Sequence, residues 1–131
     1  MTAQIHTYDY AVIRVVPRVE RGEFINAGVI VSCQGAKMLA CAIDLDVTRL
    51  RAIDPNADIE AICLHLGAIE RICVGGADAG PIGELPARQR FHWLTAPRSS
   101  IIQMSPVHTG RAAKTENVVE HLLARMVRAP Q

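Results

Sequence analysis

One stretch sets the architecture of this chain: Tyr8-Asp-Tyr-Ala-Val-Ile-Arg-Val-Val-Pro-Arg-Val-Glu-Arg-Gly-Glu-Phe-Ile-Asn-Ala-Gly-Val-Ile-Val-Ser-Cys33. Two runs in it, Tyr10 to Val16 and Phe24 to Cys33, are rich in Val and Ile, which is typical of strands. The residues between them, Pro17 to Glu23, include a glycine and four charged side chains. We therefore expect two apolar strands joined by a charged loop, and loops held on rigid strands are where functional residues concentrate.

Each of these two strands has one apolar face and one mixed face. Side chains alternate across a sheet, so the first strand has one wholly apolar face and one face that carries Arg14. In the second strand Asn26 and Gly28 interrupt one face in the same way. If the apolar faces coincide, Arg14, Asn26 and Gly28 share the mixed face, where we expect a polar pocket.

A third strand should follow after a short glycine-containing link. Residues 37–43 are apolar at nearly every position, so both faces should be covered and this strand should be the most enclosed of the three. The segment before the first strand, residues 1–7, is short and mixed in polarity, and we expect it to fray.

The rest of the chain predicts helices and one more strand. The apolar periodicity and the capping residues predict these elements: helices over 47–53, 55 or 58–74, 86–96 and 115–127, and a strand over 100–105. The glycines at 75–80 predict a flexible connection. The fold class is therefore α+β, a three-stranded antiparallel meander plus a fourth strand covered by about four helices, in the order β-β-β-α-α-α-β-α.

Length and composition narrow the classes of protein. The 131 residues, half of them hydrophobic and 21% charged, fit a single domain over 1–131. A net charge of +1 makes nucleic acid an unlikely partner, because phosphate recognition usually shows a basic face. No apolar run approaches the length of a membrane span and no signal peptide is evident, so we expect a cytoplasmic protein without membrane contact.

Metal, cofactor and thiol chemistry find little support. The five histidines include no pair at helical spacing, so we expect no metal site and no cofactor. Cys33, Cys41, Cys63 and Cys73 lie in apolar surroundings, which predict free thiols with raised pKa values rather than nucleophiles.

Two groups of residues are candidates for binding. The first is the charged loop with the polar residues of the mixed strand face: Arg14, Arg18, Glu20, Arg21, Glu23 and Asn26. Guanidinium groups there could hold a carboxylate or phosphate ligand. The alternative is that the charges pair with one another and only hold the loop in shape.

The second group lies at the two ends of the fourth strand. Arg98, Ser99 and Ser100 precede it, and His108 and Thr109 follow it, so a cation, hydroxyls and an imidazole are available. The alternative is ordinary turn chemistry, because Ser, Thr, Gly and Pro are common turn residues. No acidic partner or nucleophile elbow accompanies the Ser and His, so a catalytic triad is not indicated.

Three segments resemble one known family. Residues 10–31, 90–100 and 105–110 are similar to the bacterial domain-of-unknown-function family 3037, and the likeness covers nearly the whole chain. The resemblance implies no activity, but it implies a protein partner, because family members are often encoded beside a HipA-like kinase-fold protein. The sequence differs from the family at Arg111-Ala-Ala-Lys114, where an acidic stretch is expected.

Two functional hypotheses follow from the residues and the resemblance. The first is a small non-catalytic accessory or protein-interaction domain, a partner or regulator of a HipA-like kinase-fold protein. The alternative is a small enzyme or binding protein that recognises a phosphate- or carboxylate-bearing ligand through its arginine-rich loop.

Overall fold

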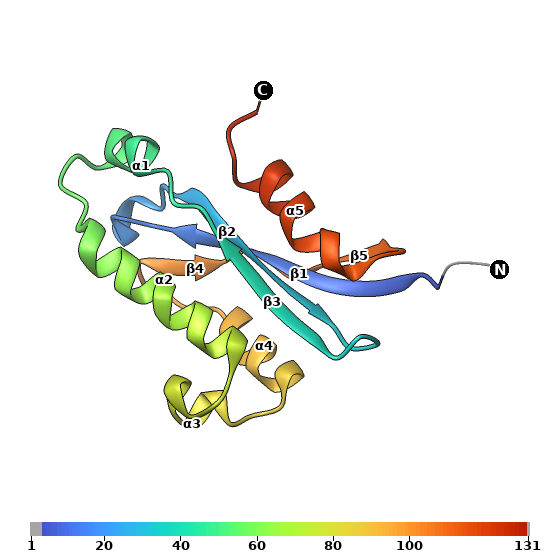
Figure 1. Cartoon of the computed structure of the whole chain (residues 1–131). Coiled ribbons are helices and arrows are strands. Elements are labelled where there is room, and N and C mark those ends of the chain that lie inside the picture. Colours follow the sequence, from blue (N-terminus) through green and yellow to red (C-terminus); the bar gives the residue numbers. More distant parts are fainter. Residues whose placement is uncertain (1–3, 131) are drawn as a thin grey trace.

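A computed structural model describes residues 4–130 of the chain and confirms the α+β class (Figure 1). The strands are β1 (His6–Val15), β2 (Ile25–Cys33), β3 (Met38–Ile43), β4 (Ile102–Met104) and β5 (His108–Ala112). The helices are α1 (Val47–Ile53), α2 (Ile59–Val74), α3 (Gly80–Gly83), α4 (Ala87–Thr95) and α5 (Val118–Met126). Single 3₁₀ turns occupy Val19–Arg21, Ala77–Ala79 and Thr115–Asn117.

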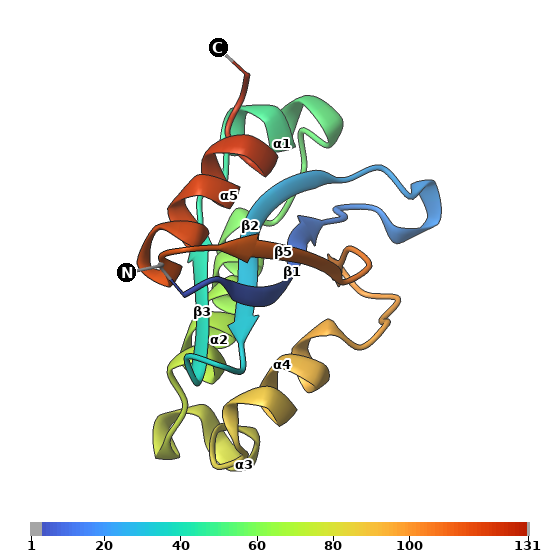
Figure 2. The same cartoon turned by 90° about the vertical axis from the view of Figure 1, so that its right-hand side faces the viewer.

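Strand β1 is the centre of the sheet. The strand order is β3-β2-β1-β4, and β5 also pairs with β1, so β4 and β5 follow one another along the same side of this long strand. Figure 2 shows β5 beside β1. All pairings are antiparallel. The Val15 end of β1 pairs with β4 and the His6 end pairs with β5.

Ser105 joins β4 to β5 across the middle of β1. Its backbone N–H donates to the carbonyl of Val12 over 2.9 Å, and its Oγ accepts from the Val12 N–H over 2.8 Å. The same hydroxyl donates to the carbonyl of Pro106 over 2.9 Å. The serine side chain thus replaces a backbone acceptor at the position where proline interrupts the edge strand.

A β-bulge in β2 changes which residues share a face. Ile13 pairs with Gly28 and Arg14 pairs with Asn26, so Ala27 is the extra residue. Arg14 and Asn26 therefore lie on one face, as expected, but Gly28 lies on the other, which corrects the sequence prediction. A side chain at Gly28 would approach the Ala42 carbonyl oxygen to 2.6 Å, so the close packing of β2 on β3 requires glycine.

Helices cover both faces of the sheet. The larger core lies between the sheet and α1, α2 and α4, and it contains Ile13, Leu50, Leu66 and Phe91. The smaller core lies under α5, which packs on β2 and β3 through Leu122 and its neighbours. Both faces are covered, as the apolar pattern of the strands predicts (Figure 1).

The sequence predicts β3 to be the most enclosed strand, but in the structure it is an edge of the sheet. All six of its residues are only half-buried. Its two faces are apolar because α2 packs on one and α5 on the other, while one side of its backbone has no neighbouring strand within the described residues. The hydrophobic pattern of a strand shows whether its two faces are covered, but it does not show whether another strand pairs with each of its edges. The prediction was wrong for this reason.

Other differences concern short or polar elements. The sequence predicts turns after residue 105, but His108–Ala112 forms β5, which backbone pairing with β1 holds although most of its side chains are exposed. Residues 6 and 7 belong to β1 and do not fray. The segment expected to be a helix from Thr115 begins with a 3₁₀ turn, and Thr115 makes no capping hydrogen bond there.

The glycine-rich connection after α2 is ordered by one arginine. Arg90 of α4 donates to the carbonyls of Ile72, Cys73 and Leu85 over 2.6, 2.8 and 2.9 Å. The guanidinium donates to carbonyls at the end of α2 that have no partner within the helix, and its positive charge interacts favourably with the negative end of the helix dipole. The connection therefore folds into a 3₁₀ turn and α3 rather than a flexible loop.

No helix within residues 4–130 has both the length and the hydrophobicity that crossing a lipid bilayer requires.

We predict that Ser105→Ala lowers the free energy of unfolding by about 1–3 kcal/mol, because the Val12 N–H would be buried without its acceptor. Ser105 is only 4% exposed, so water cannot replace the hydroxyl. Ser99→Ala, at an exposed serine, is the matched control and should change stability by less than about 0.5 kcal/mol. Chemical denaturation measures both, and equal effects of the two substitutions would contradict the role of Ser105.

Candidate functional site

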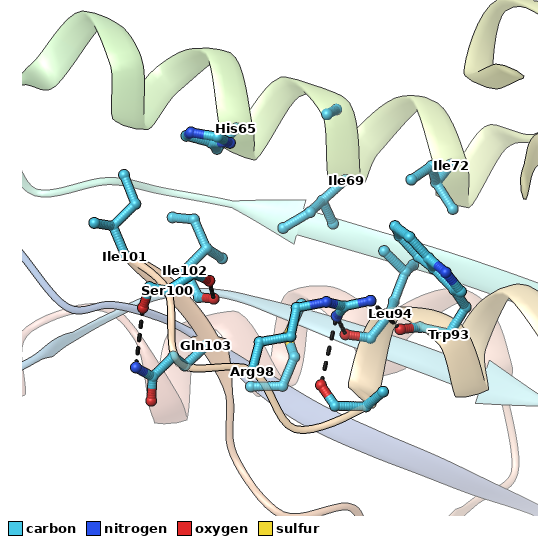
Figure 3. A pocket seen from close by; sticks show the side chains of 13 residues that line it. His65, Ile69, Ile72, Trp93, Leu94, Arg98, Ser100, Ile101, Ile102 and Gln103 are labelled. Atoms are coloured by element: carbon cyan, nitrogen blue, oxygen red, sulfur yellow. Dashed lines mark hydrogen bonds between the residues drawn. The ribbon is translucent and has the colours of Figure 1, made fainter. Parts of the chain in front are cut away.

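A largely apolar hollow of about 230 Å³ lies between α2, α4 and the strand β4 (Figure 3). Helix α2 and helix α4 form two walls, and residues 98–104 form the third. The lining residues are His65, Ala68, Ile69, Ile72, Trp93, Leu94, Ala96, Arg98, Ser100, Ile101, Ile102, Gln103 and Met104. This volume accommodates a large apolar side chain or a small ligand rather than an extended substrate.

Arg98 takes its position in this hollow from the end of α4. Its guanidinium donates to the carbonyl of Leu94 over 3.0 Å and to that of Trp93 over 2.6 Å. It also stacks over the Trp93 ring at 4.4 Å from the ring centroid. Helix carbonyls at a C-terminus lack intrahelical partners and attract cations, which explains why the arginine folds back.

Trp93 and Arg98 together form an exposed amphipathic surface beside the hollow. The tryptophan is 41% exposed, although large aromatic side chains are usually buried. The ionisable residues in the lining are His65 and Arg98, and the lining contains no carboxylate. The hollow therefore suits a group that is apolar and adjoins a negative charge.

The segment that closes the hollow is held by its own hydrogen bonds. The Ser100 hydroxyl donates to the carbonyl of Ile102 over 2.7 Å, and the Gln103 side-chain amide donates to the carbonyl of Ser100 over 2.9 Å (Figure 3). Ser99 is exposed and does not line the hollow. Of the second predicted group, Arg98 and Ser100 thus belong to this hollow.

A second, polar hollow of about 330 Å³ lies at the opposite end of β1. Its lining includes Asp9, Ser32 and Arg88, and the residues around them are Gln4, Ile5, His6, Thr7, Gln34 and Gly35. Arg88 reaches from α4 to donate to Asp9 Oδ2 over 2.7 Å and to Ser32 Oγ over 3.0 Å. Thr109 donates to Asp9 Oδ1 over 2.8 Å, so a polar row crosses three strands.

Asp9 stays ionised in this row. Partial burial alone would raise the pKa of its carboxyl, but the hydrogen bonds from Thr109 and Arg88 and the positive charge of Arg88 outweigh burial and lower the pKa. The Nε of Arg88 is buried without a hydrogen-bond partner. The row fastens α4 to the sheet, and its opposite charges offset each other.

Sequence reasoning missed Asp9, Ser32 and Arg88. One signal was available: Asp9 and Ser32 are the polar residues of otherwise apolar strand faces, and they pair directly across β1 and β2. A polar pair at one position of two neighbouring strands predicts a shared partner from the covering helix. The helix residue that supplies it depends on the packing of α4.

Most charged residues of the loop have ion-pair partners, either within the loop or at Asp54. Arg21 pairs with Glu23 at the surface, and Arg18 reaches the buried carboxylate of Asp54 over 3.4 Å. Glu20 is exposed. Neither hollow is lined by a residue of this loop or by His108, so the loop and the His108 segment do not share one of these two sites.

The remaining predicted residues lie on the sheet face that α5 covers in part. Arg14 stacks over Phe24 at 4.3 Å, and its Nε is buried without a hydrogen-bond partner. The side-chain amide of Asn26 donates to the carbonyl of Met126 over 2.9 Å, which ties α5 to β2. The His108 ring lies 5.6 Å from that of Tyr10. The predicted residues are thus divided among several places.

The thiols include one contacting pair. Hydrogen bonding between Cys41 of β3 and Cys73 of α2 lowers the pKa of Cys41 and, together with burial, raises that of Cys73. The raised pKa of Cys73 agrees with the sequence prediction for a thiol in apolar surroundings. Within residues 4–130 no three His, Cys, Asp or Glu side chains are grouped so that they could hold a metal ion.

We predict that Arg21→Ala changes the free energy of unfolding by less than about 0.5 kcal/mol, because an exposed ion pair contributes little. Arg18→Ala should destabilise the protein more, since Asp54 is only 5% exposed and would lose a charged partner. Urea titration of the two variants side by side measures the difference. A larger loss for Arg21→Ala would show that the loop depends on the surface pair.

Asp9 should make stability depend on pH. Its pKa in the folded state is lowered, so its contribution is full above the ordinary aspartate pKa of about 3.9 and is lost as the pH falls through the lower folded pKa. Asp9→Asn should therefore be less stable than the natural protein near neutral pH, with the difference shrinking in acid. Thr109→Val removes one hydrogen bond to Asp9 and should reduce this pH-dependent difference. Thermal melts over a pH series measure it, and a difference that grows in acid would contradict the assignment.

Comparison with known proteins identifies a family but no activity. Neither the curated proteins nor the solved structures include a significant match to this chain. The family model described as Protein of unknown function (DUF3037) matches residues 10–127. This range includes α2, α4 and residues 98–104, which form the three walls of the hollow beside Trp93, called the Trp93 hollow below. The chain therefore belongs to the DUF3037 family.

Proposed function

We propose that this chain is a small non-catalytic interaction domain that binds a partner protein through the hollow between α2, α4 and β4. The observation that supports the proposal best is the exposed Trp93, stacked under Arg98 at the rim of an apolar hollow. Tryptophan and arginine are the residues most enriched at the energetic centres of protein interfaces. Both side chains are already held in place, so a partner would not have to order them on binding.

The charge of the hollow defines the chemistry of the partner segment. Because Arg98 and His65 line it and no carboxylate does, the bound segment should insert an apolar side chain and place an acidic residue beside Arg98. The HipA-like kinase-fold protein implied by the family resemblance is the partner to test first. The proposal keeps the bacterial, cytoplasmic setting that the sequence suggests.

A second candidate uses the same hollow for a small anionic molecule. The volume of about 230 Å³ and the single guanidinium favour a ligand with one carboxylate or phosphate on an apolar body. The anion would then bind at Arg98, whose hydrogen bonds go to backbone carbonyls, and not at Arg18 or Arg21 of the charged loop, which pair with carboxylates. A thermal-shift panel of carboxylates and phosphates tests it, because a ligand that binds only the folded state raises the midpoint.

We predict that Trp93→Ala and Arg98→Ala each weaken binding to the purified HipA-like neighbour at least tenfold, or about 1.4 kcal/mol. Isothermal titration calorimetry measures the dissociation constants. Leu64→Ala is the matched control, because Leu64 is an exposed apolar residue of α2 outside the lining of the hollow, and it should leave binding unchanged. Arg98→Lys keeps the charge but loses the stacked, forked geometry of the guanidinium. Its affinity should therefore lie between those of Arg98→Ala and Leu64→Ala.

Melting curves of each variant establish that it is folded before titration. The interaction proposal fails if the natural protein does not bind the HipA-like kinase-fold protein, or if Trp93→Ala binds it as tightly as Leu64→Ala does.

A further inference from the structure

The outer side of β3 is an open sheet edge. Within the described residues no strand pairs with it, and its sequence Met38–Ile43 contains no charged residue and no proline. Its register with β2 runs without a shift, so no bulge twists it away from an approaching strand. Natural proteins usually protect such an edge with charge, proline, a bulge or a covering segment.

The opposite edge of the sheet shows that protection. It is divided into the short strands β4 and β5, with Pro106 between them and Arg111 within β5. The contrast indicates that β3 is kept free for pairing, because the same chain blocks its other edge.

One hydrogen bond determines which backbone groups of β3 point outward. The Asp44 N–H donates to the Ala27 carbonyl over 2.8 Å, so Asp44 points its backbone groups toward β2. Direction alternates along a strand, and therefore the N–H and C=O groups of Leu39, Cys41 and Ile43 face away from the sheet.

These outward groups are complementary to themselves. In an antiparallel pair two opposed residues exchange both hydrogen bonds, and a two-fold axis normal to the sheet keeps corresponding faces together. If Cys41 lies opposite Cys41 of the second copy, Leu39 lies opposite Ile43. Every outward N–H and C=O of Leu39, Cys41 and Ile43 then has a partner, which a shifted register does not achieve.

The charges at the two ends of the strand favour the same arrangement. Lys37 precedes β3 and Asp44 follows it, and both side chains are exposed. Asp44 Oδ2 pairs with Arg128 of its own chain over 3.0 Å at the surface, and this exposed pair can rearrange when Lys37 of a second copy approaches. Antiparallel pairing brings Lys37 of one copy near Asp44 of the other, whereas parallel pairing would bring like charges together. The charge pattern therefore favours antiparallel over parallel pairing with a second copy of this chain.

We propose that this protein forms a symmetric dimer in which β3 pairs antiparallel with β3 of a second copy, with Cys41 at the two-fold axis. The two sheets join into one. None of residues 38–43 lines the Trp93 hollow, so the pairing uses none of its lining residues and the dimer has two such hollows. The dimer is independent of the proposed function of that hollow.

The first test uses Cys41 as its own reporter. Hydrogen-bonded antiparallel neighbours have Cα atoms about 5.5 Å apart, within the range of about 4.4–6.8 Å that a disulfide spans. Oxidation by copper–phenanthroline and dioxygen removes two electrons and two protons from the facing thiols and forms the bond between copies. Cys73→Ser serves as the background, since Cys73 contacts Cys41 within one chain.

The expected result is a dimer by light scattering and a reducible dimer band after oxidation. The band should disappear in Cys41→Ser and persist in Cys63→Ser, because Cys63 is exposed on α2 and serves as the control. A natural protein that is monomeric at all concentrations tested overturns the proposal. A band that persists without Cys41 overturns it as well.

The second test uses a charge at the two-fold axis. Cys41→Lys and Cys41→Asp each place like charges opposite one another, so each alone should be monomeric, with its fold checked by circular dichroism. Mixing the two variants should restore the dimer, since only the mixed pair has opposite charges across the axis. Dimerisation of either variant alone to the extent of the natural protein overturns the Cys41 register, and so does a mixture of two folded variants that stays monomeric.

Discussion

The structure depends on the backbone pairing of β1 along both of its sides. Strand β2 occupies one side, and β4 and β5 share the other, so residues more than ninety positions apart in the chain meet on this strand. The pairing continues past a proline because the Ser105 hydroxyl accepts the Val12 N–H in place of a backbone carbonyl. Without it, the Val12 N–H would be buried with no acceptor at the point where β4 passes into β5.

Arginine side chains fasten the helices to this sheet and to one another. Arg90 satisfies carbonyls at the end of α2, Arg98 does the same for α4, and Arg88 pairs with Asp9 of β1. A guanidinium can serve several acceptors at once, which suits helix ends whose carbonyls have no other partner. These three arginines therefore have structural partners. Arg98 differs because its stacked face is at the rim of a hollow that contains no carboxylate.

The two surfaces with the clearest unmet chemistry lie at opposite sides of the sheet. The Trp93 hollow offers apolar area beside a cation, and the β3 edge offers unpaired backbone groups. One suits a foreign segment of apolar and acidic character, and the other suits a copy of itself. A dimer through β3 would give the interaction domain two equivalent sites, so a partner with two binding segments would be bound with higher avidity.

The hydrophobic periodicity of the sequence predicted the strands and helices that form mainly because their apolar side chains are buried. The Val- and Ile-rich strands β1 and β2, and helix α2 with its cap at Asp58, follow from periodicity and capping alone. The polar strand β5 did not follow, because only its backbone pairing with β1 holds it. Among the predicted binding residues, Arg98 and Ser100 line the hollow, while Arg18 and Arg21 are occupied by carboxylates.

The sequence by itself determined that this chain is an α+β protein whose sheet has one apolar and one mixed face and helices to cover them, since burial of apolar side chains depends on their spacing along the chain. It also carried the likeness to the DUF3037 family, which the family match confirms. Only the tertiary structure decided that β3 is an edge, that a bulge moves Gly28 to the other face of the sheet from Asn26, and that Arg98 stacks on Trp93. The reason is physical: edges, bulges and charge partners arise from contacts between segments distant in the chain, and no local spacing of residues encodes them.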